Sequence, residues 1–478
     1  MTGYERLEML IDGEWTAGSD AASMAVENPA TEATIGDLPL ASTQDLDRAL
    51  AASLQGFNVW KDTPALQRQG ILENAARLLE ERREQIARTC TLEIGKPLRE
   101  SLMEIDFTIG VLRWYAEEGK RAYGRVVPAR DIRVRNTVLK EPVGPVVGFA
   151  AWNFPAVNVI RKVAGALAAG CSIIVKPSEE APGTAIAIAR CFQDAGLPRG
   201  VLNVVFGNPA DTSAYLLSSS IPRKVTFTGS VPVGIHLQTL AARTLKRCTL
   251  ELGGHAPFIV LPDADVELAA QTAAAFKLRN AGQVCTSPSR FFVHSSVHDR
   301  FVGVFADAFE KAVVGDGLDD AATMGPLAAQ RRLEVMDRLV ADARDHGASV
   351  VTGGKRIGNR GWFFAPTLLD EVPDEAAIMR EEPFGPVAPV SRFEDLDEVI
   401  ERANSVEVGL ASYVFTRNGG WAQEATRRLN AGLVGINCAA ISLPETPFGG
   451  VDHSGYGSEG GIEGLDAFMR TKFVAEIR

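Results

Sequence analysis

Apolar runs alternate with amphipathic stretches along the middle of this chain. Stretches with helical spacing, such as that from Ala181 to Ala195, separate short runs that are typical of buried strands. The runs span residues 143–149, 172–176, 201–206 and 224–228. Strands that alternate with helices form parallel sheets covered by helices on both faces. The pattern therefore predicts an α/β fold.

Two further segments carry the same kinds of pattern. A second α/β unit is expected to begin near Pro257 and to run to about Ile441, with a helix that opens at Asp263 and Asp265. Nearer the N-terminus, apolar residues of the stretch 64–88 recur at helical spacing, which predicts one helix whose solvated face carries the charge run Glu80–Glu84. At 478 residues, the chain is long enough for about three domain-sized units.

Composition narrows the class of protein. The net charge of -11 and the lack of a basic cluster argue against a nucleic-acid surface. The N-terminal residues lack a basic region followed by an apolar one, so no signal peptide is expected, and the most apolar stretch is too short to cross a bilayer. Six cysteines without paired spacing and six scattered histidines predict a reducing compartment, no disulfide framework and no metal site. These properties predict a soluble enzyme of the cytoplasm.

Cys285 is the strongest candidate for chemistry. It lies in the run Asn280–Arg290, beside Gly282 and small polar residues, after an Ala-rich stretch that is predicted to be helical. Such a neighbourhood exposes a thiol to a ligand, whereas most cysteines are small buried apolar residues. A free thiol is only slightly ionised at neutral pH, so a catalytic role also requires a base or oriented dipoles nearby.

Two other polar residues follow apolar runs. Glu251 ends one run and precedes two glycines, which allow the backbone to turn sharply and to approach other groups closely. Asn153 follows the run 143–149, where a side-chain amide can donate a hydrogen bond to a developing oxyanion. A solvated glutamate at a strand end, and an asparagine selected for its turn geometry, are the alternatives for these segments alone.

Together these segments resemble the aldehyde dehydrogenase superfamily. Further motifs stand in the family's order over essentially the whole chain: Ile11–Trp15, Asn28–Thr31, Ile174–Glu179, Phe227–Ser230, Glu381–Pro386 and Pro447–Gly450. The resemblance implies a Rossmann-like parallel-sheet NAD-binding domain, an α/β catalytic domain and a small β oligomerisation arm that joins subunits into dimers or tetramers. The implied boundaries are 1–122 and 142–254 for the NAD-binding domain, 255–442 for the catalytic domain, and 123–141 and 460–478 for the arm.

A phosphate site is predicted where a strand meets a helix. The run Val225–Ser230 leads into a helix near Pro232, and a helix N-terminus binds phosphates through its free amides; an ordinary strand-to-helix turn is the alternative. The run Gly455–Gly460 fits G-x-G-x-x-G but follows a polar stretch, so we reject it as a phosphate loop.

The resemblance also implies the cofactor residues. Lys176 and Glu179 would hold the adenosine ribose, Glu382 would hold the nicotinamide ribose, and Phe384 would pack on the nicotinamide. A glutamate at position 179 favours NAD over NADP, with NADP still possible. The full implied set is Trp152, Lys176, Ser178, Glu179, Gly229, Ser230, Gly234, Leu252, Glu382 and Phe384.

The implied chemistry begins with attack of the Cys285 thiolate on an aldehyde carbon. The side-chain amide of Asn153 and the backbone N–H of Cys285 would hold the oxyanion, hydride would pass to the nicotinamide, and Glu251 would activate water to hydrolyse the thioester. Glu459 matches a family glutamate that assists this water, although Ser458 and Asp452 depart from the residues common nearby. Coenzyme A-acylating relatives usually lack the base, so a free acid is the expected product.

Two arginines indicate the kind of aldehyde. Arg161 lies eight residues after Asn153 and Arg279 lies six residues before Cys285, so both are expected to line the substrate tunnel. With Ser442 they resemble the carboxylate site of succinate semialdehyde dehydrogenases. The surrounding sequence resembles 2-oxoglutarate semialdehyde dehydrogenases equally, so the shared expectation is an ω-oxo acid. The alternatives are arginines in ion pairs on a helix face, and a dehydrogenase for neutral or aromatic aldehydes with an apolar tunnel shaped by Trp152, Phe154 and Phe448.

The residues that follow the nucleophile also differ from those of some relatives. Such relatives regulate themselves through a second cysteine beside the nucleophile. Thr286 and Ser287 occupy that place here, so no local disulfide switch is expected.

Overall fold

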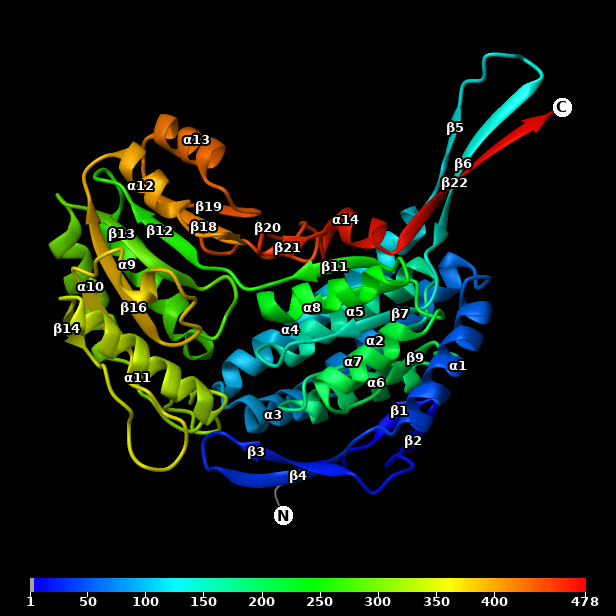
Figure 1. Cartoon of the computed structure of the whole chain (residues 1–478), viewed down its shortest axis with the longest axis horizontal. Helices are drawn as coiled ribbons and strands as arrows, with labels where there is room; N and C mark the ends of the chain where they lie inside the picture. The colour runs from blue at the N-terminus through cyan, green and yellow to red at the C-terminus, as the bar shows by residue number, and fades with distance from the viewer. Residues whose placement is uncertain (1–3) are drawn as a thin grey trace.

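The computed structural model describes residues 4–478 as two large sheets with helices packed around them and a narrow arm that projects from the body (Figure 1). Residues 1–3, part of the segment in which no signal peptide is predicted, lie outside the described range. Both large sheets consist mainly of parallel strands that alternate with helices along the chain, so the predicted α/β class is confirmed.

Eight strands form the first sheet. Its five central strands are parallel, and the four apolar runs predicted as strands supply four of them. All residues of β7 and β8 are buried, as expected for the centre of such a sheet. In spatial order the strands are β2 (Glu14–Thr16), β1 (Met9–Ile11), β9 (Leu202–Val204), β8 (Ile173–Lys176), β7 (Val146–Phe149), β10 (Lys224–Thr228), β11 (Arg247–Glu251) and β21 (Gly455–Tyr456).

Helices cover this sheet. Four of them follow its strands, and each carries proline in its first turn, where the missing N–H is not needed for a helical hydrogen bond. They are α5 (Pro155–Ala169), α6 (Pro182–Asp194), α7 (Pro209–Ser218) and α8 (Val231–Ala242). The N-terminal helices are α1 (Thr43–Trp60), α2 (Ala65–Glu81), α3 (Arg83–Ile94) and α4 (Leu98–Glu118), followed by the short helix η1 (Gly119–Arg121).

The single helix predicted for the stretch 64–88 is wrong. Arg82 leaves the helical conformation (φ -99°, ψ 8°) and separates α2 from α3. Apolar spacing continues across the break because both helices bury one face against α4 and α6. The charged residues there are not simply solvated either, since Glu80 pairs with Arg113, Arg82 with Asp194 and Arg83 with Asp106.

The second sheet has seven strands with an apolar core on each face. In spatial order they are β14 (Ser349–Thr352), β15 (Thr367–Asp370), β16 (Val387–Phe393), β13 (Pro288–His294), β12 (Ala256–Val260), β18 (Ala411–Phe415) and β19 (Leu433–Ile436). Its helices are α9 (Val266–Leu278), α10 (His298–Glu310), α11 (Gln330–Asp345), α12 (Leu396–Ala403) and α13 (Gly419–Arg428), with the short helices η2 (Arg279–Gly282) and η3 (Ala377–Met379). Asp265 caps α9 by accepting from Leu268 N, near the predicted start.

The projecting arm is a three-stranded antiparallel sheet. β22 (Met469–Ile477) pairs with β6 (Val134–Pro142) along its full length, and β5 (Arg125–Val127) lies on the other side of β6 (Figure 1). The smaller elements are β3 (Ser23–Asn28) with β4 (Ala33–Pro39), β17 (Val408–Gly409) with β20 (Val451–Asp452), and α14 (Gly461–Asp466). Among the helices that the structure describes, none combines the length and apolar character needed to cross a membrane.

Candidate active site

The three catalytic candidates meet in one cavity between the two large sheets. Cys285, Glu251 and Asn153 all line it, and its volume of about 530 Å³ suits a small-molecule site. The substrate candidates Arg161, Arg279 and Ser442 line it too, together with six cofactor candidates: Trp152, Gly229, Ser230, Leu252, Glu382 and Phe384. Residues far apart in the sequence therefore line one cavity, as the family resemblance implied.

Cys285 follows a tight turn that joins α9 to β13. Asn280, Ala281 and Gly282 all have left-handed backbones (φ 47°, 50° and 70°), and a Cβ on Gly282 would clash with the carbonyl of Gly385. The turn brings the thiol to the cavity wall. Burial raises the pKa of Cys285 to about 12, with the Glu382 and Glu251 carboxylates adding to this effect and Arg161 opposing it. The resting side chain is therefore a protonated thiol that needs a base.

Asn153 has one amide hydrogen left for a ligand. Its Nδ2 donates to the carbonyl of Gln283 at 3.1 Å, and its Oδ1 accepts from Asn158 Nδ2 at 3.1 Å. These two bonds define the orientation of the amide and leave its second N–H without a partner among the hydrogen bonds described. An oriented donor of this kind can stabilise an oxyanion.

A buried ion pair supports the Asn153 backbone. Lys96 Nζ donates to the carbonyl of Asn153 and to Glu104 Oε2, each at 2.7 Å, and Glu104 Oε1 accepts from the backbone N–H of Ala156 in the first turn of α5. Both charged side chains are fully buried. Sequence reasoning missed them because their partners are far along the chain and neither interrupts a helical or strand pattern.

Glu251 lies at the end of β11 as a buried carboxyl group. Neither of its oxygens has a hydrogen-bond partner within residues 4–478. Burial and the nearby Glu459 carboxylate raise the pKa of Glu251 well above its usual value, while Arg161 and Lys162 oppose the rise. A carboxylate with this environment can accept a proton near neutral pH.

Glu459 occupies the same corner of the cavity with fixed partners. Its Oε1 accepts from Lys162 Nζ at 2.7 Å and from Thr226 Oγ1 at 3.2 Å, and all of these side chains are buried. Glu459 therefore acts on the site as a positioned charge. Lys162 carries no sequence signal because it lies within the continuously buried helix α5.

Arg161 is a buried cation that forms no ion pair with any carboxylate of residues 4–478. Only 5% of it is exposed, its Nη2 donates to Ser442 Oγ at 2.8 Å, and its guanidinium lies 4.1 Å from the ring centre of Phe448. In the described part of the chain, no carboxylate oxygen lies within 4 Å of the Arg161 or Arg279 guanidinium. The Arg279 guanidinium lies 5.1 Å from the ring centre of Phe154. A buried cation that lacks a counter-ion is suited to bind an anionic ligand group.

The residues proposed for a nicotinamide dinucleotide fit that group. Ser230, the N-cap of α8, lines the cavity and its side chain makes no capping bond, so the N-terminus of this helix is available to an anionic group. A Cβ on Gly234 would lie 2.6 Å from Leu252, so glycine allows α8 to approach the strand end closely. These features suit a phosphate group.

Other side chains suit the ribose and ring parts of such a cofactor. Lys176 Nζ pairs with Glu179 Oε1 at 2.5 Å, and the Ser178 hydroxyl donates to Glu180. Burial raises the pKa of Glu382 to about 8, against the effects of the Gly254 amide, Arg332 and Lys277. Phe384 has a left-handed backbone (φ 45°) and its ring meets that of Trp152 edge to face at 5.5 Å.

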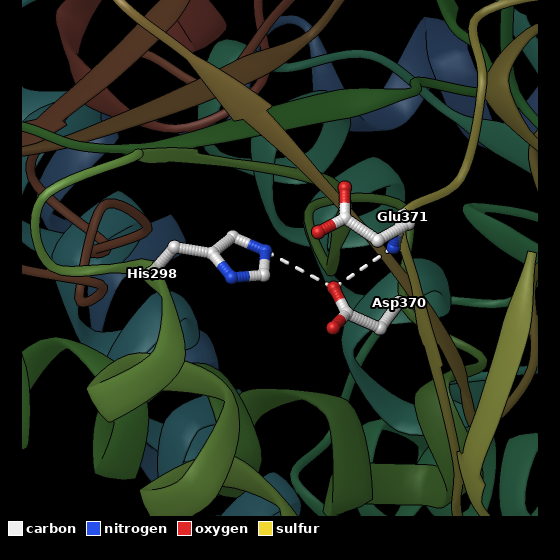
Figure 2. Close-up of side chains that lie close together, drawn as sticks. All are labelled: His298, Asp370 and Glu371. Carbon is white, nitrogen blue, oxygen red and sulfur yellow. Dashed lines mark hydrogen bonds and ion pairs between the residues drawn. The ribbon is translucent and has the colours of Figure 1, made fainter.

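A second polar cluster lies outside this cavity. His298 on α10 points towards Asp370 at the end of β15, with Nε2 3.0 Å from Oδ1, and Glu371 follows in the turn (Figure 2). Arg392 already pairs with Glu371 and with Asp299, at 2.5 and 2.6 Å. The cluster is an ion-pair network that joins α10 to the turn after β15, and we assign no metal to it.

Comparisons with known proteins agree with this geometry. The model of the aldehyde dehydrogenase family matches residues 15–474. A 4-(hydroxymethyl)benzenesulfonate dehydrogenase of Comamonas testosteroni is 46% identical over 98% of each chain, and the NADP(+)-dependent succinate-semialdehyde dehydrogenase of Escherichia coli K12 is 40% identical over 98% of this chain and 97% of its own. The crystal structure of succinate-semialdehyde dehydrogenase from Burkholderia pseudomallei superposes with a TM-score of 0.98 at 41% identity, covering 99% of this chain and 98% of that one.

Proposed function

Since this chain belongs to the aldehyde dehydrogenase family, we propose that it oxidises an aldehyde bearing an anionic group to the corresponding acid. Succinate semialdehyde is the first candidate. The observation that carries this proposal is Arg161, a buried guanidinium bonded to Ser442 and without a carboxylate partner within 4 Å among the residues described. A substrate carboxylate would supply the missing counter-ion.

The proposed reaction begins at Cys285. As the sulfur of Cys285, which lines the cavity, adds to the aldehyde carbon, the thiol proton leaves to a water molecule. The remaining N–H of the Asn153 amide and the Cys285 backbone N–H would hold the oxyanion, each contributing about 3 kcal/mol to the transition state.

The second half of the proposed reaction releases the acid. A nicotinamide dinucleotide, when bound, supplies the hydride acceptor that the oxidation requires. The product of that oxidation is a thioester on Cys285. Glu251 then removes a proton from water, the hydroxide adds to the thioester carbonyl, and the acid leaves as the thiol is restored. Glu459, bonded to Lys162, is proposed to adjust the proton affinity of Glu251 rather than to contact the substrate.

NAD is the proposed cofactor, with NADP as the alternative. Glu179 can accept hydrogen bonds from a free 2′-hydroxyl and would repel a 2′-phosphate. NADP stays open because Lys176, paired with Glu179 at 2.5 Å, could bind a phosphate instead, and because one relative is named as NADP(+)-dependent.

A second candidate substrate is an aromatic aldehyde that carries a sulfonate. The observation that favours it is the aromatic lining of the cavity. Phe107 and Phe448 lie beside Arg161, Phe154 lies beside Arg279, and Phe276 also lines the cavity. The relative at 46% identity is named for a benzenesulfonate. Carboxylate and sulfonate share the anionic oxygens that Arg161 and Ser442 would bind. The remaining candidate substrates are 2-oxoglutarate semialdehyde and neutral aldehydes, whether aromatic or aliphatic.

Assembly and location complete the proposal. The arm strands expose apolar side chains such as Phe473 and Ile477, which suit a contact with a second copy, so we propose a homo-oligomer, either a dimer or a tetramer. A cytoplasmic location and the three domains with their stated boundaries also remain predictions.

Arginine variants test the substrate proposal. Arg161→Gln and Arg279→Ala are each expected to lower kcat/KM for succinate semialdehyde roughly a hundredfold, because a substrate carboxylate would lose its counter-charge. The corresponding loss of transition-state stabilisation is about 3 kcal/mol. Hexanal, which has no anionic group, is expected to react almost as before in Arg279→Ala. In Arg161→Gln it should lose much less than succinate semialdehyde, because only the effect of Arg161 on the pKa values of Cys285 and Glu251 is removed. The measurement is steady-state kinetics with succinate semialdehyde, 2-oxoglutarate semialdehyde, 4-formylbenzenesulfonate, benzaldehyde and hexanal.

Arg161→Lys is the matched control, since it keeps the charge and should retain part of the preference for anionic aldehydes. Equal losses for hexanal and succinate semialdehyde would remove the anion-binding role of these arginines. A wild-type enzyme that prefers benzaldehyde or hexanal would favour the neutral-aldehyde alternative.

A further inference from the structure

An ion pair connects the two α/β units across the candidate cofactor cleft. Arg331, in the first turn of α11, donates through Nη2 to Glu180 Oε1 at 2.5 Å. Glu180 stands in the turn after β8, directly after Glu179 of the proposed adenosine site. Arg331 lines the same cavity as Gly229 and Ser230, which precede the first turn of α8.

This ion pair contributes little to folding stability. The Arg331 side chain is 57% exposed and that of Glu180 31% exposed. Exposed ion pairs typically contribute about 0–1 kcal/mol to folding. The pair is therefore weak enough to exchange when a better anion arrives.

Neighbouring cations are already committed to other groups. Arg332 donates to the carbonyls of Pro383 and Phe384, at 2.5 and 3.2 Å, and supports the loop that carries the proposed nicotinamide residues. Lys176 pairs with Glu179 at 2.5 Å. Arg331 differs from Arg332 and Lys176 in that it lines the cavity and its only described partner is a part-exposed side chain.

The Glu180 carboxylate can compete with an anionic ligand for Arg331. Burial raises its pKa, but the hydroxyl of Ser178 and the guanidinium of Arg331 outweigh burial and hold the pKa of Glu180 below its ordinary value. At neutral pH the Glu180 carboxylate is therefore charged, and it pairs with Arg331 when no other anion binds there.

We propose that Arg331 is a cofactor-binding residue that Glu180 holds before the dinucleotide binds and that transfers to a phosphate of the dinucleotide on binding. This inference rests on the proposed use of a nicotinamide dinucleotide. The phosphate could belong to the pyrophosphate, which NAD and NADP share, or to the 2′-phosphate that only NADP carries. Bidentate guanidinium–phosphate bonds would replace the guanidinium–carboxylate bond.

Exchange of partners predicts opposite effects for the two halves of the pair. Arg331→Gln removes a phosphate ligand and should weaken dinucleotide binding about tenfold, whereas Glu180→Gln removes the competitor and should tighten binding about threefold. In the double variant the gain from Glu180→Gln should vanish, because no arginine is left to release. If the ion pair served only to hold the two units in position, both single variants would instead change the dinucleotide affinity in the same direction.

The experiment is calorimetric titration of the full-length enzyme with NADH and with NADPH, in the absence of aldehyde. Arg338→Gln is the matched control, because Arg338 lies on the same helix and pairs with the exposed Glu381 at 2.5 Å but does not line the cavity. It should leave both affinities unchanged.

The two ligands distinguish the source of the phosphate. Equal weakening of NADH and NADPH by Arg331→Gln would support the pyrophosphate as partner, and weakening of NADPH alone would support the 2′-phosphate. Unchanged affinities in both single variants, or a loss of similar size in both, would overturn the role of Arg331. A wild-type enzyme that binds neither dinucleotide would refute the proposed function itself.

Discussion

Carboxyl groups and one thiol share a cavity that disfavours their charged forms. Burial raises the pKa of Cys285 to about 12. Burial and the charge of the nearby Glu459 carboxylate both raise the pKa of Glu251. A carboxylate whose pKa is raised in this way can take a proton from water near neutral pH, which is the step that the proposed hydrolysis needs.

The pH dependence of thioester hydrolysis follows from Glu251. The carboxylate is the active form, so the rate is lost as pH falls through a pKa that lies well above the ordinary value. Glu459→Gln removes a like charge and should move this acid limb to lower pH, because the pKa of Glu251 falls. The measurement is the single-turnover deacylation rate as a function of pH.

Lys162→Met is the control variant, which should shift the acid limb in the opposite direction. Lys162 lowers the pKa of Glu251, so its removal should move the acid limb to higher pH. An acid limb that stays in place in both variants would show that Glu251 is not the group that titrates.

Sequence reasoning identified candidate residues that line the cavity but not those that hold them in place. Cys285, Glu251 and Asn153 stand out because each follows an apolar stretch at a glycine-rich or turn-forming segment. Lys96 and Glu104 do not, because their importance comes from partners on other elements.

At the scale of elements, apolar periodicity predicted where the helices and strands lie, but it did not predict where a helix is interrupted or where the backbone turns. The four strands around β7 were predicted, but the break at Arg82 was not, since it contains neither glycine nor proline and both helices bury the same face. The left-handed turn Asn280–Gly282 was also not predicted. Only Gly282 marks it, and the backbone conformation of its neighbours depends on packing.

The Lys96–Glu104 pair links three elements, so its loss should affect both stability and catalysis. Lys96→Met leaves Glu104 buried without a counter-ion and should lower the free energy of unfolding by about 3–5 kcal/mol. It should also lower kcat, because the Asn153 carbonyl loses its donor. Chemical denaturation and steady-state kinetics measure the two effects.

Arg77→Met is the control for this prediction. Arg77 pairs with Glu81 at 2.5 Å, but both side chains are 56% exposed, so the change should cost less than about 1 kcal/mol. Similar losses in the two variants would mean that burial of the Lys96 pair carries no special weight.

At the scale of the whole molecule, the site exists only because two α/β units face each other. Glu251 and Asn153 come from segments of the first sheet, Cys285 from the segment that enters the second, and Arg331 reaches back from the second to the first. Sequence order and family resemblance indicated this meeting. The cross-cleft pair required the structure, because nothing in the two local sequences connects residue 180 with residue 331.

The most direct test of the account is a mass measurement on the Glu251→Gln enzyme mixed with succinate semialdehyde and NAD. Loss of the base should leave the acylated enzyme trapped, so the peptide that contains Cys285 should gain the mass of one succinyl group as NADH forms. The Cys285→Ser enzyme should gain no such mass. NADH formation with an unmodified Cys285, or with the succinyl group on another residue, would contradict the account.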